Sequence, residues 1–159
     1  MNLYTRRTTL RAGLGALTAF AVSPALAGAS LPNVIVNKDP NCGCCQKWAD
    51  HLAAAGFPVQ IVAQGDLAPL KAKLGVTDEL RSCHTAEVDG YVLEGHVPAD
   101  AVLRLLRERP TAIGLAVPGM PAGSPGMEGG TPETYDVILF GNDFRKTYAR
   151  YRGTASLPV

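Results

Sequence analysis

The chain has 159 residues, of which 47% are hydrophobic and 18% are charged. Its 15 lysines and arginines nearly balance its 14 acidic residues, which gives a formal net charge of +1 at pH 7. This balance does not indicate a nucleic-acid-binding protein or a protein that binds an anionic membrane surface.

Residues 1–27 are typical of an export signal. Paired arginines, Arg6 and Arg7, precede an apolar stretch at 14–22, and Ala25-Leu26-Ala27 offers a small-x-small cleavage site. The arginine pair resembles a twin-arginine signal. We expect cleavage after Ala27 rather than retention as a membrane anchor, because polar residues interrupt the apolar stretch. Cleavage would take the formal net charge from +1 to about −2, since three arginines leave with the segment.

Residues 28–159 are then predicted to form a single periplasmic domain, with no nucleic-acid partner and no membrane association after signal removal. The chain has four cysteines, and an even number in an oxidising compartment ordinarily indicates disulfides. The twin-arginine route carries folded proteins, however, so a metal could be loaded before export.

The first predicted element is a buried strand at 33–37, followed by a polar turn that ends at Asn41, a favourable helix N-cap. The helix after this turn buries a face that begins at Cys45. Cys42 and Cys44 therefore fall in its first turn, where free amide groups and the helix dipole favour thiolate over thiol.

A second strand is predicted at 57–62, and Asp66 caps a short helix that ends before Gly75. The leucines of this helix share one face, which we expect to be buried: Leu67, Leu70 and Leu74.

Asp89-Gly90 lies between two short β-type runs, and this dipeptide predicts a type I′ hairpin over 85–93. A third helix is predicted from Pro98 to Arg109. Residues 118–130 are too rich in proline and glycine for a regular element, and a strand at 135–140 then turns into a last segment at 144–151.

The order strand, helix, strand, helix, hairpin, helix is that of a thioredoxin-like domain. We therefore predict an α/β, thioredoxin-like fold with a mixed central sheet, flanking helices, and a C-terminal loop plus strand extension. In such a fold the residue entering the third strand, usually a cis-proline, packs against the cysteine motif of the first helix. Cys83-His84-Thr85 takes that place here, which would add two ligands beside the cysteine run.

Soft ligands dominate this predicted site, and thiolate, thioether and imidazole together suit Cu(I) and, less selectively, zinc. The predicted cluster consists of Cys42, Cys44, Cys45 and Cys83, with His84 as the imidazole ligand. Four thiolates in a small volume repel one another, so bound cations are needed to keep them ionised. Several Cu(I) ions bridged by sulfur would balance that charge.

Four segments together resemble the CopG type of periplasmic copper-resistance protein. They are the Cys-x-Cys-Cys run at 42–45, Ser82-Cys83-His84-Thr85, Gly95-His96-Val97-Pro98 and the Pro-Gly-Met-Pro-x-Gly-Ser-Pro-Gly-Met-Glu loop at 118–128. The resemblance covers residues 33–140. It implies a thioredoxin-like fold that holds a cysteine-bridged, multinuclear copper site. It also implies a role in copper tolerance that includes interconversion of Cu(I) and Cu(II).

Other residues are assigned by weaker signals. Met120 and Met127 are seven residues apart in a proline- and glycine-rich loop, where packing gives little reason for methionine, so we expect a lid that presents thioether sulfur to copper. His96 fits a capping or supporting role as well as ligation. His51 is expected to be half-buried and not a ligand, and Trp48 to lie in the core.

Three other interpretations stay open. A thiol-disulfide oxidoreductase could use Cys42 and Cys45, whose spacing is Cys-x-x-Cys. A zinc or iron-sulfur site is the second, although the spacings match no usual zinc ribbon. A purely structural disulfide framework is the third, although adjacent Cys44 and Cys45 are hard to pair without strain. The expected partners are copper ions and periplasmic copper-efflux or electron-transfer proteins. The sequence leaves open an enzymatic role, which would be that of a copper oxidoreductase.

Overall fold

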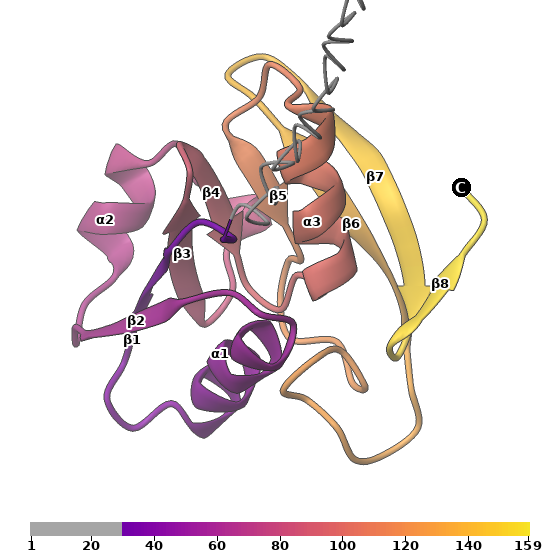
Figure 1. The fold of residues 1–159 in the computed structure, drawn as a ribbon, viewed down its shortest axis with the longest axis horizontal. Helices are drawn as coiled ribbons and strands as arrows, with labels where there is room; N and C mark the ends of the chain where they lie inside the picture. The colour runs from indigo at the N-terminus through magenta and orange to yellow at the C-terminus, as the bar shows by residue number, and fades with distance from the viewer. Residues whose placement is uncertain (1–29) are drawn as a thin grey trace, which may run out of the picture.

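The computed structural model describes residues 30–159, so the predicted export signal at 1–27 lies outside the described residues (Figure 1). The helices are α1 (Gly43–Ala54), α2 (Ala68–Lys73) and α3 (Ala99–Glu108), and a single 3-10 turn, η1, occupies Asp78–Leu80. The strands are β1 (Val34–Lys38), β2 (Val59–Ala63), β3 (His84–Val88), β4 (Tyr91–Glu94), β5 (Gly114–Ala116), β6 (Thr134–Phe140), β7 (Arg145–Arg152) and β8 (Ala155–Leu157). Within residues 30–159, no helix combines the length and apolar character that crossing a membrane requires.

The strands form one eight-stranded sheet in the order β2-β1-β3-β4-β5-β6-β7-β8. Strand β1 pairs parallel with β2 and antiparallel with β3, and β4 pairs antiparallel with β3 and parallel with β5. Strands β5 to β8 then pair antiparallel in succession. The predicted α/β class, mixed sheet, and C-terminal loop and strand extension are confirmed, and the extension ends in one more short strand, β8, than the sequence indicated.

The β3–β4 hairpin turns at Asp89 and Gly90, as predicted. Both residues have positive φ, 46° and 86°, which a type I′ turn requires. Val88 pairs with Tyr91 and Thr85 with Glu94, so the turn fixes a register in which paired residue numbers sum to a constant. This register controls which residues face each other beyond the ends of the two strands.

The two faces of the sheet are covered by different helices. Trp48 of α1 and Leu105 of α3 belong to one core together with Leu93 of β4. Val92, the neighbour of Leu93, points to the opposite face and packs in a second core with Leu80 of η1. Figure 1 shows α3 over β5 and β6, α1 below β1 and β2, and α2 at the left. The cysteines meet between the start of α1 and the ends of β3 and β4.

The buried face of α2 differs from the prediction. Leu67, at the N-cap, is buried as expected, but Leu70 and Leu74 are only half-buried, and Lys71 is the buried residue within this helix. The physical reason is that the Lys71 ammonium reaches the sheet and finds the carboxylate of Glu94 there. Leucine spacing alone could not show this partner.

His51 of α1 holds the beginning of α3. The backbone N–H of Ala99 donates to His51 Nε2 at 3.1 Å, so this imidazole serves as the acceptor that the helix start lacks. Burial lowers the pKa of His51, although the nearby carboxylates of Glu128 and Asp100 oppose this effect. The half-buried, non-ligand position predicted for His51 agrees with this contact.

Stability should therefore depend on the protonation of His51. The unfolded chain protonates first as pH falls below about 6.5, so folding free energy is lost between that pH and the lowered folded pKa. His51→Gln keeps an acceptor oxygen near the Nε2 position and does not titrate. We expect the parent to lose stability relative to His51→Gln when urea unfolding is compared at pH 8 and pH 5. His51→Ala is the control for the hydrogen bond and should cost about 1 kcal/mol at pH 8. Parallel pH profiles of parent and glutamine variant would contradict the role given to His51.

Candidate metal centre

The first cysteine caps α1. The carboxylate of Asp39 accepts a hydrogen bond from the backbone N–H of Asn41 at 2.7 Å, and the Asp39 carbonyl accepts from Cys42 N at 3.0 Å. This turn uses Asn41, so the N-cap is Cys42, whose Sγ accepts from Cys45 N at 3.4 Å. The predicted cap at Asn41 is wrong by one residue because the turn closes on Asp39. Cys42 and Cys44 still lie at the helix start, as expected.

The four cysteines come together. Cys42 and Cys45 form a disulfide with a Cα–Cα distance of 5.4 Å, while Cys44 and Cys83 are free thiols. Cys44 Sγ lies 3.5 Å from Cys42 Sγ and 3.9 Å from Cys83 Sγ. The predicted position of Cys83 beside the cysteine run is therefore correct. In this oxidised form Cys42 and Cys45 carry no thiolate, so four-sulfur ligation requires their reduction.

Two histidines lie on the other side of Cys83. Cys83 Sγ is 3.4 Å from His84 Nδ1 and 3.1 Å from His96 Nε2. Cys83, His84 and His96 form a second group whose ligand atoms lie within 4.8 Å of one another, as do those of the four cysteines. Cys83 belongs to both groups. A metal ion in each group would therefore share the Cys83 sulfur.

The role of His96 is not determined by its local sequence, but the register of the β3–β4 hairpin gives its position. Thr85 pairs with Glu94, and two further residues along each chain bring Cys83 opposite His96. The Asp89-Gly90 turn, already predicted, sets this pairing. Extending the predicted hairpin beyond its last paired strand residues would have identified His96.

The hydrogen bond of His96 orients its ring as a nitrogen ligand. Pro125 O can only accept, so His96 Nδ1 carries the proton in their 2.7 Å contact, and the lone pair of neutral His96 is on Nε2, facing Cys83. His84 Nε2 is buried and has no hydrogen-bond partner among the described residues. Buried polar atoms without partners are rare in folded proteins. The nitrogens placed to bind a metal beside Cys83 are His96 Nε2 and His84 Nδ1, at 3.1 and 3.4 Å from its Sγ.

Burial sets the protonation states of Cys83, His84 and His96. It lowers the pKa of His84 well below its usual value, and repulsion from His96, when that ring is protonated, and from the Lys71 ammonium acts in the same direction. Burial also lowers the pKa of His96, so both imidazoles are neutral at pH 7. The pKa of Cys83 is raised to about 12, first by burial and then by the charge of Cys44. Without a cation the Cys83 sulfur therefore carries its proton, and a metal ion must displace it.

A buried ion pair holds the Cys83–His84 segment from behind. Glu94 Oε1 accepts from Lys71 Nζ at 2.5 Å and from the backbone N–H of Ser82 at 2.6 Å. Thr85 Oγ1 accepts from Lys71 at 2.9 Å and donates to Glu94 Oε2 at 2.7 Å. Burial raises the pKa of Glu94, and the Lys71 ammonium opposes that shift. The pair thus holds the residues on either side of the two ligands, Ser82 through its backbone N–H and Thr85 through its hydroxyl.

The loop at 118–130 lies over the same site. Besides the Pro125 carbonyl on His96, the Ser82 hydroxyl donates to Gly119 O, which ties the loop to the Cys83 segment. Gly126 has a φ of 88°, and a Cβ there would lie 2.6 Å from Cys44 O and 2.9 Å from Trp48 N. Only glycine fits so close to the start of α1. The loop therefore lies beside both ligand groups, and its role as a lid stays a prediction.

The two methionines of that loop differ in exposure. Met120 is 53% exposed, and Met127 is half-buried. Their assignment as copper ligands stays a prediction. Trp48 is fully buried, as predicted, and its Nε1 donates to Val97 O at 2.9 Å, next to His96. Trp48 also stacks near His84, with ring centroids 4.3 Å apart, so it shields this imidazole from water.

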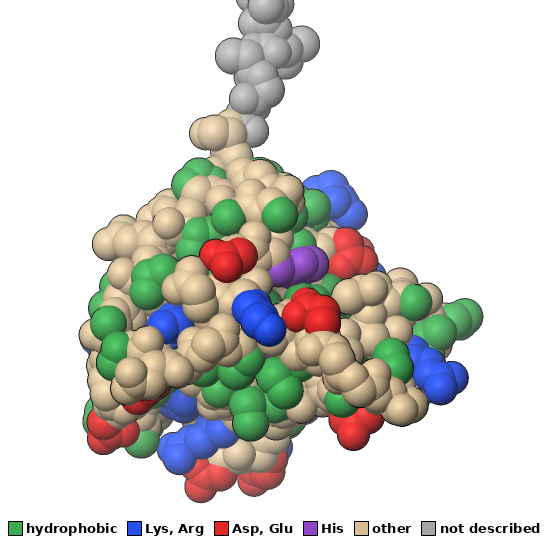
Figure 2. Space-filling view, turned by 90° about the horizontal axis from the view of Figure 1, so that it is seen from below, with side chains coloured by type: hydrophobic (Ala, Val, Ile, Leu, Met, Phe, Trp, Pro, Cys, Tyr) green, Lys and Arg blue, Asp and Glu red, His purple; other side chains and the backbone are tan. Residues whose placement is uncertain are grey.

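The exposed surface offers little access to these ligands. Figure 2 looks onto the side of the molecule seen from below in Figure 1, where acidic and basic side chains are interspersed. His84 and His96 are fully buried and do not contribute to the histidine surface seen there. Cys42, Cys44 and Cys83 are half-buried, whereas Cys45 is buried. These three cysteines are therefore the partly exposed residues of the site.

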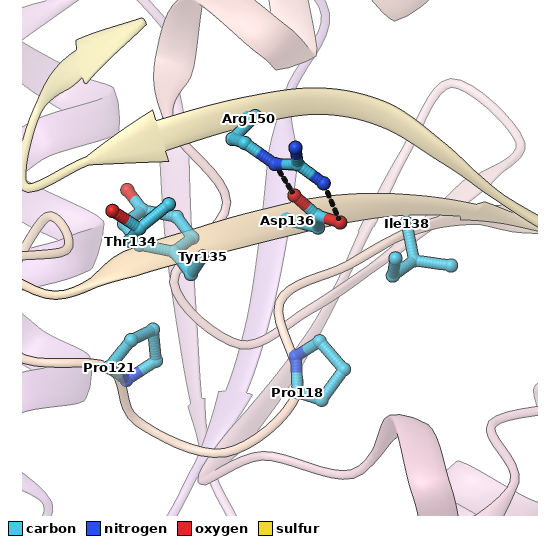
Figure 3. A pocket seen from close by; sticks show the side chains of 7 residues that line it. All are labelled: Pro118, Pro121, Thr134, Tyr135, Asp136, Ile138 and Arg150. Carbon is cyan, nitrogen blue, oxygen red and sulfur yellow. Dashed lines mark hydrogen bonds and ion pairs between the residues drawn. The ribbon is translucent and has the colours of Figure 1, made fainter. Parts of the chain in front are cut away.

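A surface pocket of about 510 Å³ lies elsewhere, between the beginning of the loop and β6 (Figure 3). Its lining residues are Pro118, Pro121, Thr134, Tyr135, Asp136, Ile138 and Arg150. Figure 3 shows Arg150 facing Asp136, and Arg150 Nε lies 2.6 Å from Asp136 Oδ1. Because the charges pair with each other and no cysteine or histidine lines the pocket, it is separate from the candidate metal centre.

Comparisons with known proteins agree with the resemblance found in the sequence. A family model described as a protein of unknown function, DUF411, matches residues 80–127. Two solved structures, both named copper resistance protein CopG and distinguished as Form 1 and Form 2, are 44% identical to this chain with a TM-score of 0.72. The match covers 77% of this chain and 99% of Form 1, and 76% of this chain and 98% of Form 2. No match was found among the curated proteins.

Proposed function

This chain belongs to the family of the copper resistance protein CopG, and we propose that it binds more than one Cu(I) ion in a sulfur-bridged site and changes the oxidation state of copper there. The observation that carries the proposal is the position of Cys83 in both ligand groups. A thiolate can bridge two metal ions, and a shared sulfur makes adjacent binding possible without a second complete ligand set. Copper ions are the proposed cargo, and copper resistance the proposed role.

The donor atoms favour copper over harder metals. The two groups supply cysteine sulfur and neutral imidazole nitrogen. The nearby carboxylate of Glu94 is already bound by Lys71, Ser82 and Thr85. Sulfur and imidazole suit Cu(I), whereas calcium and magnesium need several oxygen ligands. We propose that Cys42, Cys44, Cys45, Cys83, His84 and His96 hold the metal when the disulfide is reduced.

We also propose that the protein is exported to the periplasm by the twin-arginine-type signal at 1–27 and that residues 28–159 form one thioredoxin-like domain. The strand order β2-β1-β3-β4, with β1 and β2 parallel, supports the thioredoxin-like assignment. Proposed protein partners are periplasmic copper-efflux or electron-transfer proteins.

Anaerobic titration of the fully reduced protein with Cu(I), against a competing chromogenic chelator, tests the proposed function. We expect more than one Cu(I) per chain, and weaker binding of Zn(II) in a parallel titration. Saturation at one Cu(I) or fewer would contradict the shared-sulfur arrangement. A higher affinity for Zn(II) would contradict the assignment of copper.

A thiol-disulfide oxidoreductase is the second candidate, and the Cys42–Cys45 disulfide at the start of α1 is the observation that favours it. The position of Cys83 and His84 against this pair argues against it, because ligands occupy the place where a peptide substrate would lie. Reduction of a mixed-disulfide peptide substrate by the copper-free protein, at a rate that copper loading does not change, would favour this candidate.

The methionine lid gives a further prediction. Replacing Met120 or Met127 with leucine keeps the apolar bulk and removes the thioether, so the free energy of unfolding should change by less than about 1.5 kcal/mol. For at least one variant, the Cu(I) affinity or the rate of copper transfer to a chelator should change clearly. If both variants match the parent in affinity and transfer rate, the methionines are packing residues and the lid supplies no ligand.

A further inference from the structure

The two ligand groups differ in what oxidation does to them. The four-cysteine group contains the Cys42–Cys45 pair, which the structure shows as a disulfide. The group of Cys83, His84 and His96 contains only one cysteine, and this cysteine stays a free thiol when the Cys42–Cys45 disulfide is present. Formation of the disulfide therefore removes two sulfur ligands from one group and none from the other.

We propose that Cys42 and Cys45 are the electron donors that reduce Cu(II) to Cu(I) at this site. The inference rests on the proposed function and names the source of the electrons. Each Cu(II) accepts one electron from one cysteine sulfur, and the two sulfurs join in the Cys42–Cys45 bond. Two Cu(II) ions and one dithiol thus give two Cu(I) ions and one disulfide, and the two thiol protons pass to water.

The geometry selects this pair. Their Cα atoms are 5.4 Å apart, within the range that a disulfide bridges. They lie at the N-cap and in the first turn of α1, so forming the bond requires no movement of another element. Cys44 and Cys83 come instead from different elements, and their Sγ atoms are 3.9 Å apart without a bond. These two thiols stay reduced beside the new disulfide.

The two thiols that do not react, Cys44 and Cys83, are placed to receive the Cu(I) that is formed. Cys44 Sγ is 3.5 Å from the disulfide sulfur of Cys42, and Cys83 Sγ is 3.1 Å from His96 Nε2. A Cu(I) ion formed at the cysteine run is therefore next to sulfur and imidazole ligands that survive the oxidation. The oxidised protein keeps the Cys83, His84 and His96 group but loses the four-sulfur group. Oxidation should consequently lower the number of copper ions that the chain can hold.

The experiment adds Cu(II), as its weak glycine complex, to the fully reduced, copper-free protein without oxygen. A chromogenic chelator counts the Cu(I) formed, a thiol reagent counts remaining thiols under denaturing conditions, and peptide mapping locates the disulfide. We expect two Cu(I) per chain, a fall from four thiols to two, and a disulfide that maps to Cys42–Cys45. In Cys42→Ser and Cys45→Ser the initial rate should fall by about tenfold or more, because the adjacent second thiol is lost. Gln46→Ser, an exposed change in the same helical turn, is the matched control and should behave like the parent.

A disulfide that maps to Cys44–Cys83, or between chains, would overturn the proposal, as would an unchanged rate in both serine variants. The mapping on the parent protein decides the question even if a variant does not fold. Separate Cu(I) loading of the reduced parent distinguishes failure of the proposed electron source from failure of the proposed function. Normal loading without Cu(II) reduction refutes only the electron source, whereas loading at or below one Cu(I) refutes the proposed function as well.

Discussion

Replacing Cys83 with serine is expected to cause the largest loss of copper binding of any single cysteine change. Cys83 is the one sulfur that both ligand groups contain. It lies 3.9 Å from Cys44 Sγ on one side and 3.1 Å from His96 Nε2 on the other. A serine hydroxyl is a hard, weak ligand for Cu(I). The variant should therefore bind one Cu(I) or fewer, with the affinity of the remaining ion lowered by about tenfold or more.

Cys42→Ser is the matched comparison, because it removes a sulfur from one group and leaves Cys83, His84 and His96 intact. It should retain more copper than Cys83→Ser under the same competing chelator. Far-UV circular dichroism should show that both variants keep the fold, since each change exchanges one small half-buried side chain for another. Equal copper loading of the two variants would mean that Cys83 does not bridge the groups.

The second large effect is expected at Glu94. Its carboxylate is fully buried and accepts hydrogen bonds from Lys71, from Ser82 N and from Thr85. Glu94→Gln leaves the Lys71 ammonium buried without a counter-charge, and removing one partner of a buried pair typically costs about 3–5 kcal/mol. We expect a loss of that size in the free energy of unfolding, measured by urea denaturation of the copper-free protein.

A double variant separates the effect of the unpaired Lys71 charge from the effect of replacing the Glu94 side chain. Lys71→Met combined with Glu94→Gln removes both charges, so it should be more stable than Glu94→Gln alone. The Ser82 N–H still has an amide oxygen to bind in this variant, so the Cys83–His84 segment should keep its position and copper loading should match the parent. A double variant no more stable than the single variant would show that the pair contributes no net coupling.

The parts of the fold that the sequence predicted are those set by local signals. The Asp89-Gly90 turn specifies the hairpin because few other dipeptides accept two positive φ angles. Cys83 was placed beside the cysteine run from the order of elements, and its distance to Cys44 agrees. The helix N-cap was displaced by one residue because Asp39 competes for the backbone of Asn41.

The features that were missed depend on contacts between distant segments. Strand β5 has three residues and includes Gly114, so it carries no β pattern of its own and forms only because β4 and β6 lie on either side. Lys71 and Glu94 are 23 residues apart, and each alone looks like an ordinary surface charge. Whether a lysine is buried depends on whether a carboxylate lies within reach in the fold. The periodicity of a single sequence does not show which distant residues will be in contact.

X-ray absorption at the copper edge, on reduced protein loaded with Cu(I) beyond one ion per chain, tests the central claim most directly. The shared Cys83 sulfur predicts a first shell dominated by sulfur with a nitrogen contribution, and a copper–copper scattering contribution from ions on one bridging thiolate. Cys83→Ser should lose that copper–copper contribution. A parent protein that holds more than one Cu(I) with no copper–copper contribution would contradict a sulfur-bridged site.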